Sequence, residues 1–537
     1  MITKTICLII DGLRSECLCS TNGRKMLFPN LDKIIKHGAV YPATSNAQST
    51  QFVMPSIFCQ NYPLDYGGYS DGIVHRPVSY IELVHKAGYE TQMISSCNQL
   101  GVASGYSRGF DKIKATIDFR VILEQNISRN LAHYFNELKN LNLNVRDKEN
   151  IEKELLDDYK KLLRAFIDTI HDTDTSVWGK KLAYYNHLVS NQSQHELTLI
   201  DTNKELILKR LSSIPAGVYW YALGKKRIPM ILFFLLRLKV GITWRWRKHT
   251  RNMPILLSHW VSVSSEIFQE LINELKNSEK IKKQHFHLHV MDVHDCISFN
   301  RIFIKIYHFK FFPKWIYAKL HGFTDRRLLY DLSLMYVDEK IGDLMNALED
   351  KQLTDKTAIV ISGDHGSSYA ESPRNYKHVY FRTYYEDISI PIVAYNCNKN
   401  ISTVPGKLRD SMSITATLLD FMKILPDKSF LGMGITNSNS NDFVISESCD
   451  SRKPNGLQTN LFYTILNEKY KVMIVLIDDM LHIRHLFDRE RDLKELVDIK
   501  KDKGMLPIIE CFIDILFLKR KELLTLRKIK RESWILK

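Results

Sequence analysis

The sequence has little of what would predict a membrane-spanning or secreted protein. No stretch approaches the roughly 20 uninterrupted apolar residues that span a bilayer. The opening MITKTICLIIDGLR holds only a short apolar run, which ends at Asp11 and Gly12 without a small-residue cleavage site. Such a segment is not typical of a signal peptide. We therefore expect a cytoplasmic protein.

Cysteine is scarce and irregularly placed. The nine cysteines among 537 residues run from Cys7 to Cys511, and an odd number without a regular spacing argues against a disulfide framework. Cys17 and Cys19 form a C-x-C pair, but no second pair accompanies them to complete a zinc site. We expect free thiols in a reducing compartment.

Acidic residues are outnumbered by basic ones. The chain carries 75 Lys and Arg against 60 Asp and Glu, a net charge of +15. Its 45% hydrophobic and 25% charged residues are ordinary for a globular protein and exclude a disordered or collagen-like chain. The basic balance favours an anionic partner, namely nucleic acid, an acidic glycan or an anionic membrane surface. Charge alone does not separate these three.

Strand and helix signals alternate near both ends of the first 433 residues. The run Thr5–Ile10 predicts a strand buried on both faces, and similar strands are expected near residues 91–95, 287–291, 358–362 and 388–394. Helical patterns at 31–37, 79–86 and 328–348 lie between them. This alternation predicts an α/β fold, a mainly parallel sheet sandwiched by helices. Reactive groups in such sheets gather at the carboxyl ends of the strands.

Changes in texture along the chain suggest four parts. Residues 1–125 and 279–433 are the two halves of the α/β core, and residues 126–278, where strand signals nearly vanish, are a helical insertion or cap. Residues 434–537 are a small α+β subdomain with a basic helical tail. Within it, residues 434–456 are rich in Ser, Asn and Gly and are expected to form a linker or loops.

Acidic and imidazole side chains follow two of the predicted strands. Asp11 comes directly after the first strand, and Asp364 and His365 follow strand 358–362 between Gly363 and Gly366. Each motif alone could be a simple turn. Together, at equivalent strand ends, they can converge on one cation.

A hydroxyl precedes the short helical pattern at 52–59. Thr50 could simply cap this helix. The same position would suit a nucleophile, because the exposed amides of a helix N-terminus bind anionic groups and a nearby metal favours the alkoxide.

Ten motifs in order resemble the alkaline phosphatase superfamily, specifically its sulfatase-like branch. The first metal-binding strand of the family resembles LIIDGLR, and its nucleophile segment resembles STQFVMPSIFCQNYP. The others are FPNLDKIIKHGAVY, SYIELVHKAGYETQMIS, HLHVMDVHD, LLYDLSLMYVDEKIGDLMNAL, TAIVISGDHG, YYEDISIPIVAYN, SITATLLDFMKIL and LFDRERDLKEL. The resemblance implies an alkaline-phosphatase-like fold.

The resemblance places Thr50 at the nucleophile position. Sulfatases need Cys or Ser there, within C/S-x-P-x-R, for conversion to formylglycine, whereas this chain has Thr50 followed by QFVM. Thr resembles the phosphodiesterase, phosphoglycerol transferase and phosphoethanolamine transferase branches. The resemblance thus implies a metal-dependent hydrolase or transferase acting on phosphate esters of a glycan or lipid-linked substrate. The alternatives are a sulfuric ester hydrolase and a non-catalytic binding protein on the same fold.

The resemblance also implies one divalent metal ion, because the stretch MDVHD lacks the D-x-x-x-H spacing of two-metal members. An imidazole with carboxylates favours Zn or Mn, with Ca or Mg as alternatives. The expected ligands are Asp11, Thr50, Asp364 and His365, with Thr50 also catalytic, and the expected substrate contacts are His294 and His378. The alternating His285, His287 and His289 share one strand face and are interpreted as mainly structural.

Three basic segments interleave Lys and Arg with apolar and aromatic residues, at 225–251, 301–319 and from Lys519 onward. This pattern suits an interfacial helix on anionic lipid. It also suits a core helix with a solvated basic edge, and nucleic acid is the least favoured partner. A lipid surface would place the protein peripherally on the inner membrane face.

Overall fold

The computed structural model divides the chain into two compact units. The first unit consists of Met1–Ser96, Arg108–Lys112 and Ile255–Lys537. The second unit consists of Cys97–Ser107 and Ile113–Pro254, and residues in both units are described. The structure describes residues 2–19, 27–95, 100, 104–115, 145–172, 193–213, 264–294, 296, 313, 316, 320, 325–368, 382–396, 401, 407–439, 441–450, 454 and 459–536. His378, segment 225–251 and most of 301–319 lie outside these residues. The predicted boundaries of the four parts stay predictions.

A seven-stranded sheet forms the centre of the first unit, in the order β2-β7-β6-β1-β5-β3-β4. Its strands are β1 (Lys4–Ile10), β2 (Ala39–Thr44), β3 (Glu90–Ser95), β4 (Lys112–Ala115), β5 (Gln284–Val290), β6 (Thr357–Ser362) and β7 (Ser389–Asn396). β1 pairs in parallel with β5 and β6, and β5 with β3, whereas β7 runs antiparallel to β6 and β2. The carboxyl ends of β1, β5 and β6 therefore meet at one edge.

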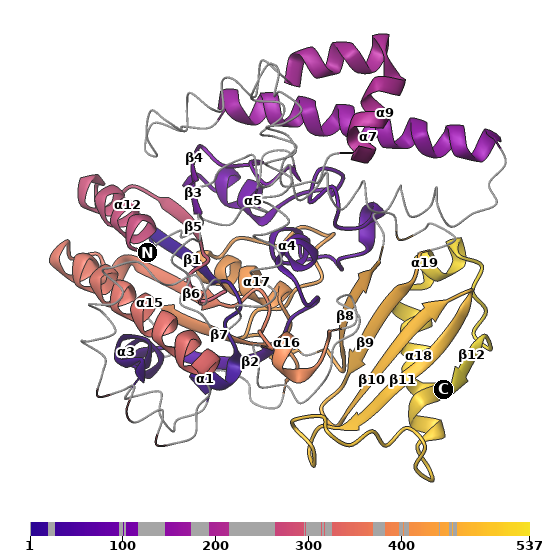
Figure 1. Ribbon diagram of the computed structural model, residues 1–537. Coiled ribbons are helices and arrows are strands. Elements are labelled where there is room, and N and C mark those ends of the chain that lie inside the picture. Colours follow the sequence, from indigo (N-terminus) through magenta and orange to yellow (C-terminus); the bar gives the residue numbers. More distant parts are fainter. Residues whose placement is uncertain are drawn as a thin grey trace. The chain divides into compact units, whose positions relative to one another are not determined.

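Helices cover both faces of this sheet (Figure 1). α3 (Pro29–His37), α12 (Ser264–Asn277) and α15 (Asp325–Asp350) lie on one face, and α4 (Thr50–Cys59), α5 (Tyr80–Lys86) and α17 (Met412–Met422) on the other. Shorter helical segments are α1 (Ser15–Cys19), η1 (Asp65–Gly67), η5 (Thr354–Lys356) and α16 (Tyr385–Ile388). Alternating side chains such as Ile6, Leu8 and Ile10 of β1 join the core under α12 and α15.

The C-terminal part of the same unit carries a five-stranded sheet in the order β12-β11-β10-β9-β8. Its strands are β8 (Val444–Cys449), β9 (Leu461–Leu466), β10 (Tyr470–Ile477), β11 (Met480–Asp488) and β12 (Trp534–Leu536), accompanied by α18 (Leu506–Lys519) and α19 (Lys521–Leu526). The prediction of loops throughout 434–456 is wrong for β8. Its polar residues are buried against neighbouring strand β9 and the segment before α4, a partner that the local composition does not reveal.

The described elements of the second unit include two helices, α7 (Val145–Asp172) and α9 (Lys204–Ser213). In α7 the buried side chains Leu155, Tyr159, Leu163 and Ile167 recur every four residues, the spacing of one helix face.

The predicted fold class is confirmed: a mostly parallel sheet lies between helices, with helical and α+β additions. β2 was not predicted, because it is a short edge strand that contains Pro42, which weakens the strand signal. Among the described residues, no helix is long and apolar enough to cross a membrane.

Candidate active site

Asp11 stands directly beyond the end of β1. Its backbone N–H donates to the carbonyl of Val290 at 3.0 Å, which continues the β1–β5 pairing by one residue. Gly12 then turns the chain with φ +74°, a conformation that favours glycine. The N–H of Gly12 donates to Asp364 Oδ1 at 3.1 Å, so the turn links the two carboxylates directly.

Asp364 and His365 follow β6 in a tightly packed loop. A Cβ atom on Gly363 would lie 2.5 Å from the carbonyl oxygen of Leu13, and one on Gly366 would overlap the carbonyl of Glu386, so both glycines are needed for the close approach. The Nδ1–H of His365 is placed to donate to the carbonyl of Gly366 at 2.6 Å. That bond leaves the lone pair of Nε2 available to a metal ion.

Thr50 is the first residue of α4, after the N-cap residue Ser49. Its hydroxyl donates to Asp11 Oδ2 at 3.0 Å and lies 3.3 Å from His365 Nε2. The alternative of a helix-capping hydroxyl therefore does not describe this side chain. Instead, Thr50 lies at the start of α4 beside the residues that follow β1 and β6, and it is only 3% exposed.

The chemistry of the carboxylates fits a cation. Asp11 Oδ1 and Asp364 Oδ2 are buried and accept no hydrogen bond from any described residue. Each lies 3.5 Å from His365 Nε2. Donor atoms around a Zn-sized ion, bound at about 2.1 Å, are separated by distances of this order. The structure thus brings together the four predicted ligands Asp11, Thr50, Asp364 and His365, and the orphaned oxygens mark where an ion would fit.

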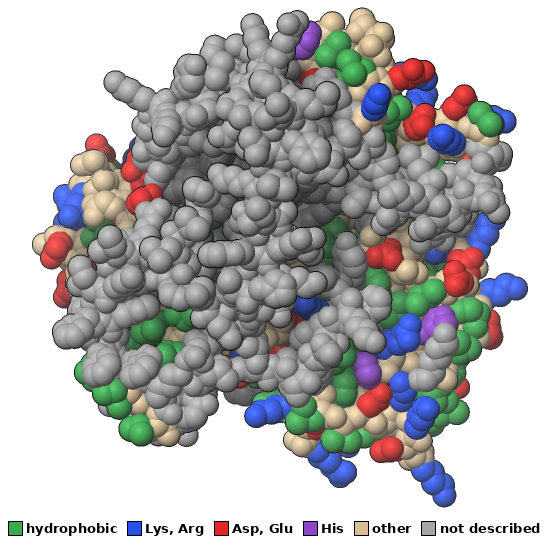
Figure 2. Space-filling view, viewed as in Figure 1, with side chains coloured by type: hydrophobic (Ala, Val, Ile, Leu, Met, Phe, Trp, Pro, Cys, Tyr) green, Lys and Arg blue, Asp and Glu red, His purple; other side chains and the backbone are tan. Residues whose placement is uncertain are grey.

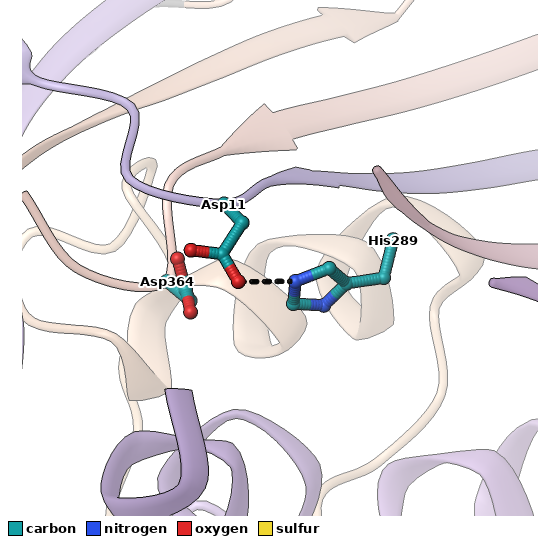
Figure 3. A group of neighbouring side chains, drawn as sticks. All are labelled: Asp11, His289 and Asp364. Carbon is teal, nitrogen blue, oxygen red and sulfur yellow. Dashed lines mark hydrogen bonds and ion pairs between the residues drawn. The ribbon is translucent and has the colours of Figure 1, made fainter. Parts of the chain in front are cut away.

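His289 is a member of the cluster that the sequence analysis missed. At the end of β5, it lies with Asp11 and Asp364 in a fully buried group whose ligand atoms are all within 4.8 Å of one another (Figure 3). Its Nε2 lies 3.2 Å from Asp11 Oδ2. The sequence held one indication of this role. His289 stands one residue before the end of its strand, and β5 pairs in parallel with β1, so the two strand ends lie at the same edge of the sheet.

His285 and His287 are structural, as expected. Both are fully buried, and the hydroxyl of Tyr80 on α5 lies 3.2 Å from His285 Nε2 and 2.7 Å from His287 Nδ1. The odd-numbered residues of β5 thus face the layer of α4 and α5, and only the last of these three histidines reaches the strand-end cluster.

Three neighbouring histidines lower the pKa of Asp11. Burial by itself would raise the pKa of this carboxyl, but the charges of His294 and His365 and the hydrogen bond from His289 outweigh it and hold the pKa well below its usual range. Asp11 is therefore an anion at neutral pH. A fully buried anion of this kind is matched to a bound cation.

His294 lies half-buried beside the cluster, with its ring centroid 6.3 Å from that of His365. The neighbouring Asp292 has a different task, because its carboxylate accepts the N–H of Ser264 at the start of α12 at 3.0 Å. The MDVHD stretch therefore supplies one histidine near the cluster. The predicted contact His378 lies outside the described residues.

Comparison with known proteins finds one family model and several solved structures that are similar to this chain. The model of the sulfatase family matches residues 231–424. No curated protein sequence matches the chain.

The fold is similar to that of several solved structures over nearly the whole chain. One is a phosphonate monoester hydrolase of Agrobacterium radiobacter, with a TM-score of 0.56 and 12% identity, covering 97% of this chain and 96% of that one. A protein of glycosaminoglycan metabolism from Bacteroides thetaiotaomicron has a TM-score of 0.53 and 12% identity, with 99% of both chains covered. A 2-O glycosaminoglycan sulfatase has a TM-score of 0.50 and 13% identity, with 99% and 94% covered.

The family match over residues 231–424 agrees with the resemblance that the motifs indicate, and the similar solved structures show that the chain shares their α/β fold. Enzymes of the sulfatase family use a divalent metal ion, and the carboxylate–imidazole cluster is a candidate site for it.

Proposed function

We propose that this protein is a metal-dependent phosphoric ester hydrolase or transferase whose nucleophile is Thr50. The observation that carries the proposal is the position of its hydroxyl, 3.0 Å from Asp11 Oδ2 and 3.3 Å from His365 Nε2. A purely structural role for the Thr50 hydroxyl would not explain the two buried carboxylates beside it. One oxygen of Asp11 and one of Asp364 accept no hydrogen bond from the described residues, which is unusual for buried polar atoms.

The residues suit a two-step transfer. Thr50 Oγ1 attacks phosphorus, forming an ester bond as the bond to the leaving oxygen breaks, and the hydroxyl proton, held by Asp11 Oδ2 before the attack, passes to solvent. We assign to His294, whose ring lies beside that of His365, the role of giving the departing oxygen its proton. Water or a sugar hydroxyl then attacks the phosphorus and gives its proton to His294, which the first step left deprotonated. The bond between phosphorus and Thr50 Oγ1 breaks, and Oγ1 takes up a proton from solvent. A divalent ion at the carboxylate cluster would supply positive charge to the reacting oxygens.

A sulfuric ester hydrolase is less well supported. Thr50 carries a methyl group on Cβ, so its oxidation cannot yield the aldehyde of formylglycine that sulfatases employ. The residue type at this position is therefore the reason to favour phosphate over sulfate.

The proposed substrate is an acidic glycan or a lipid-linked phosphate ester, and the proposed location is the cytoplasmic face of the inner membrane. The net charge of +15 supports an anionic substrate or surface. In the face shown in Figure 2, Lys and Arg side chains stand among apolar ones over the C-terminal subdomain.

The deciding experiment measures turnover of bis(p-nitrophenyl) phosphate and p-nitrophenyl sulfate by wild type, Thr50→Ala and Thr50→Ser. Loss of the nucleophile should lower phosphodiester turnover by at least roughly 10³-fold in Thr50→Ala, because the covalent route disappears. Thr50→Ser keeps the hydroxyl and should retain measurable turnover. Intact-mass analysis of rapidly quenched wild type should show a phosphoryl adduct on Thr50.

Three outcomes would count against the proposal. Full activity in Thr50→Ala would remove the nucleophile assignment. Preference for the sulfate ester would support the sulfatase alternative. Absence of turnover on both esters in metal-loaded, folded protein, together with tight binding of a glycan, would favour a binding protein.

A further inference from the structure

The buried His289 has a defined place beside the nucleophile. The parallel register of β1 and β5 aligns it with Ile9, two residues before Asp11. It is fully buried, and its Nε2 lies 3.2 Å from Asp11 Oδ2. No expectation from the family resemblance assigns it a role.

The two oxygens of Asp11 have different surroundings. Oδ2 accepts a hydrogen bond from the Thr50 hydroxyl. It also lies beside the Nε2 of His289 (Figure 3). Oδ1 accepts no hydrogen bond from the described residues and faces His365 Nε2 at 3.5 Å. The second orphaned oxygen, Asp364 Oδ2, also lies 3.5 Å from that nitrogen. The cation position is therefore on the Oδ1 side of the carboxylate, and His289 lies on the other.

A distance of 3.2 Å would also separate two ligands of a single ion. A ligand, however, must direct a lone pair at the ion, and such a nitrogen cannot at the same time donate to Asp11. The oxygen nearest to His289 Nε2 is Asp11 Oδ2, which is not one of the two carboxylate oxygens that lack a hydrogen bond. A hydrogen bond from Nε2 to Asp11 Oδ2 therefore accounts for the position of this nitrogen.

We propose that His289 is a positioning residue of the metal site: its Nε2–H holds Asp11 Oδ2, turns Oδ1 toward the cation and fixes the oxygen to which Thr50 donates, without itself binding the ion. The inference rests on the proposed function of the cluster. A group that orients a ligating carboxylate typically contributes about 10- to 100-fold to metal affinity.

The test uses Mn²⁺ as the probe on the full-length protein stripped of metal. Binding is measured by calorimetry for wild type, His289→Ala, His289→Asn, His289→Gln and Asp364→Asn. The amide nitrogen of Gln reaches the position of imidazole Nε2, whereas that of Asn is too short. We expect affinity to fall about 10- to 100-fold in the Ala and Asn variants, to recover to within about threefold of wild type in the Gln variant, and to fall further in Asp364→Asn.

Electron spin-echo spectroscopy of bound Mn²⁺ separates a positioning residue from a ligand. Coupling to one imidazole nitrogen, that of His365, is expected in wild type and unchanged in His289→Gln. Two coupled imidazoles in wild type, one of them lost in His289→Gln, would overturn the proposal.

The remaining outcomes are also informative. Wild-type affinity in His289→Ala, with weakened binding in Asp364→Asn, would refute the role of His289 and leave the proposed function standing. If Mn²⁺ and Zn²⁺ both fail to bind wild type, the metal site and the proposed function fail together. Circular dichroism of each variant identifies misfolding, and recovery in Gln but not Asn cannot arise from a general loss of fold.

Discussion

His285 shows how a single buried side chain can make stability depend on pH. Burial lowers the pKa of this imidazole to about 3, against 6.5 for an ordinary histidine. Its Nδ1 lies 2.9 Å from the hydroxyl of Thr5 and its Nε2 3.2 Å from that of Tyr80, contacts that suit a neutral ring. The folded protein therefore binds this proton only in strong acid.

The sign of the effect follows from linkage. Below pH 6.5 the unfolded chain takes up a proton at His285 that the folded state refuses, so stability present above pH 6.5 is lost progressively as the pH falls toward 3. We expect the free energy of unfolding to fall by on the order of 2 kcal/mol from this group between about pH 6.5 and 4.5. Urea unfolding of wild type and His285→Gln across that range measures it.

The readout is the slope of stability against pH rather than its absolute value, because the substitution itself can destabilise the core. His285→Gln should have the shallower slope. The exposed His37 provides a matched control, and His37→Gln should keep the wild-type slope. Equal slopes in all three proteins would contradict the assignment.

At the scale of secondary-structure elements, a buried ion pair connects β10 to the segment that supports the active-site loop. Lys471 Nζ lies 2.6 Å from Glu495 Oε1, with side-chain exposures of 1% and 3%. Glu495 Oε2 accepts the N–H of Tyr385 at the start of α16 at 3.0 Å. The carbonyl of Asp387 in α16 in turn accepts the N–H of Gly366, next to His365, at 2.8 Å.

Removing the cation of this pair should be costly. Lys471→Met leaves the Glu495 carboxylate buried without its partner, and we expect a loss of about 3 to 5 kcal/mol in the free energy of unfolding. The double variant Lys471→Met with Glu495→Gln restores neutrality and keeps an acceptor for Tyr385, so most of the loss should return. Urea denaturation of the three proteins measures both effects. A single variant within about 1 kcal/mol of wild type would show that the pair contributes little.

At the scale of the whole molecule, the structure changes the interpretation of the basic tail. Arg520 is buried and paired with Asp65 at 2.7 Å and Glu447 at 2.8 Å. Arg527 is also buried and donates to the carbonyl of Thr459 at 2.8 Å. These two cations stabilise the fold of the subdomain and are not available to a membrane. The exposed basic residues of the described tail are Lys519, Lys521, Lys528 and Lys530.

The exposed lysines stand near large apolar side chains in the sequence, with Leu518 72% and Leu526 68% exposed. If this region binds anionic lipid, Lys519→Gln with Lys521→Gln should weaken binding to phosphatidylserine-containing vesicles by about 10-fold or more at low salt. Each lysine near such a surface contributes about 1 kcal/mol, and salt screens it. Vesicle sedimentation over a salt series measures the change.

The control replaces two lysines elsewhere on the unit, Lys423 and Lys428, and removes the same charge. That variant should bind as wild type does, and both variants should keep their turnover of a small soluble ester. Equal weakening in the two double variants would indicate a nonspecific effect of net charge. Absence of vesicle binding in wild type would remove the membrane from the proposal.

Much of the fold and of the candidate site follows from the sequence alone. Strands buried on both faces leave continuous apolar runs, and the turn residues that follow them are legible because Asp-Gly and Gly-Asp-His-Gly leave few conformational choices. Since the carboxyl ends of parallel strands meet at one edge, the positions of Asp11, Asp364 and His365 directly after their strands were enough to predict that they converge.

Only the tertiary structure decided between residues of the same type in the same pattern. His285, His287 and His289 alternate on one strand, yet the β1–β5 register places only His289 beside Asp11. The hydroxyl of Tyr80 on α5 lies within hydrogen-bond distance of the other two. In the sequence, Arg520 and Arg527 cannot be distinguished from the exposed lysines around them. In the structure they are buried by residues distant in the sequence, such as Glu447 and Thr459. Local sequence determines which strand face a side chain occupies. Which partner it meets depends on register and on the packing of segments hundreds of residues apart.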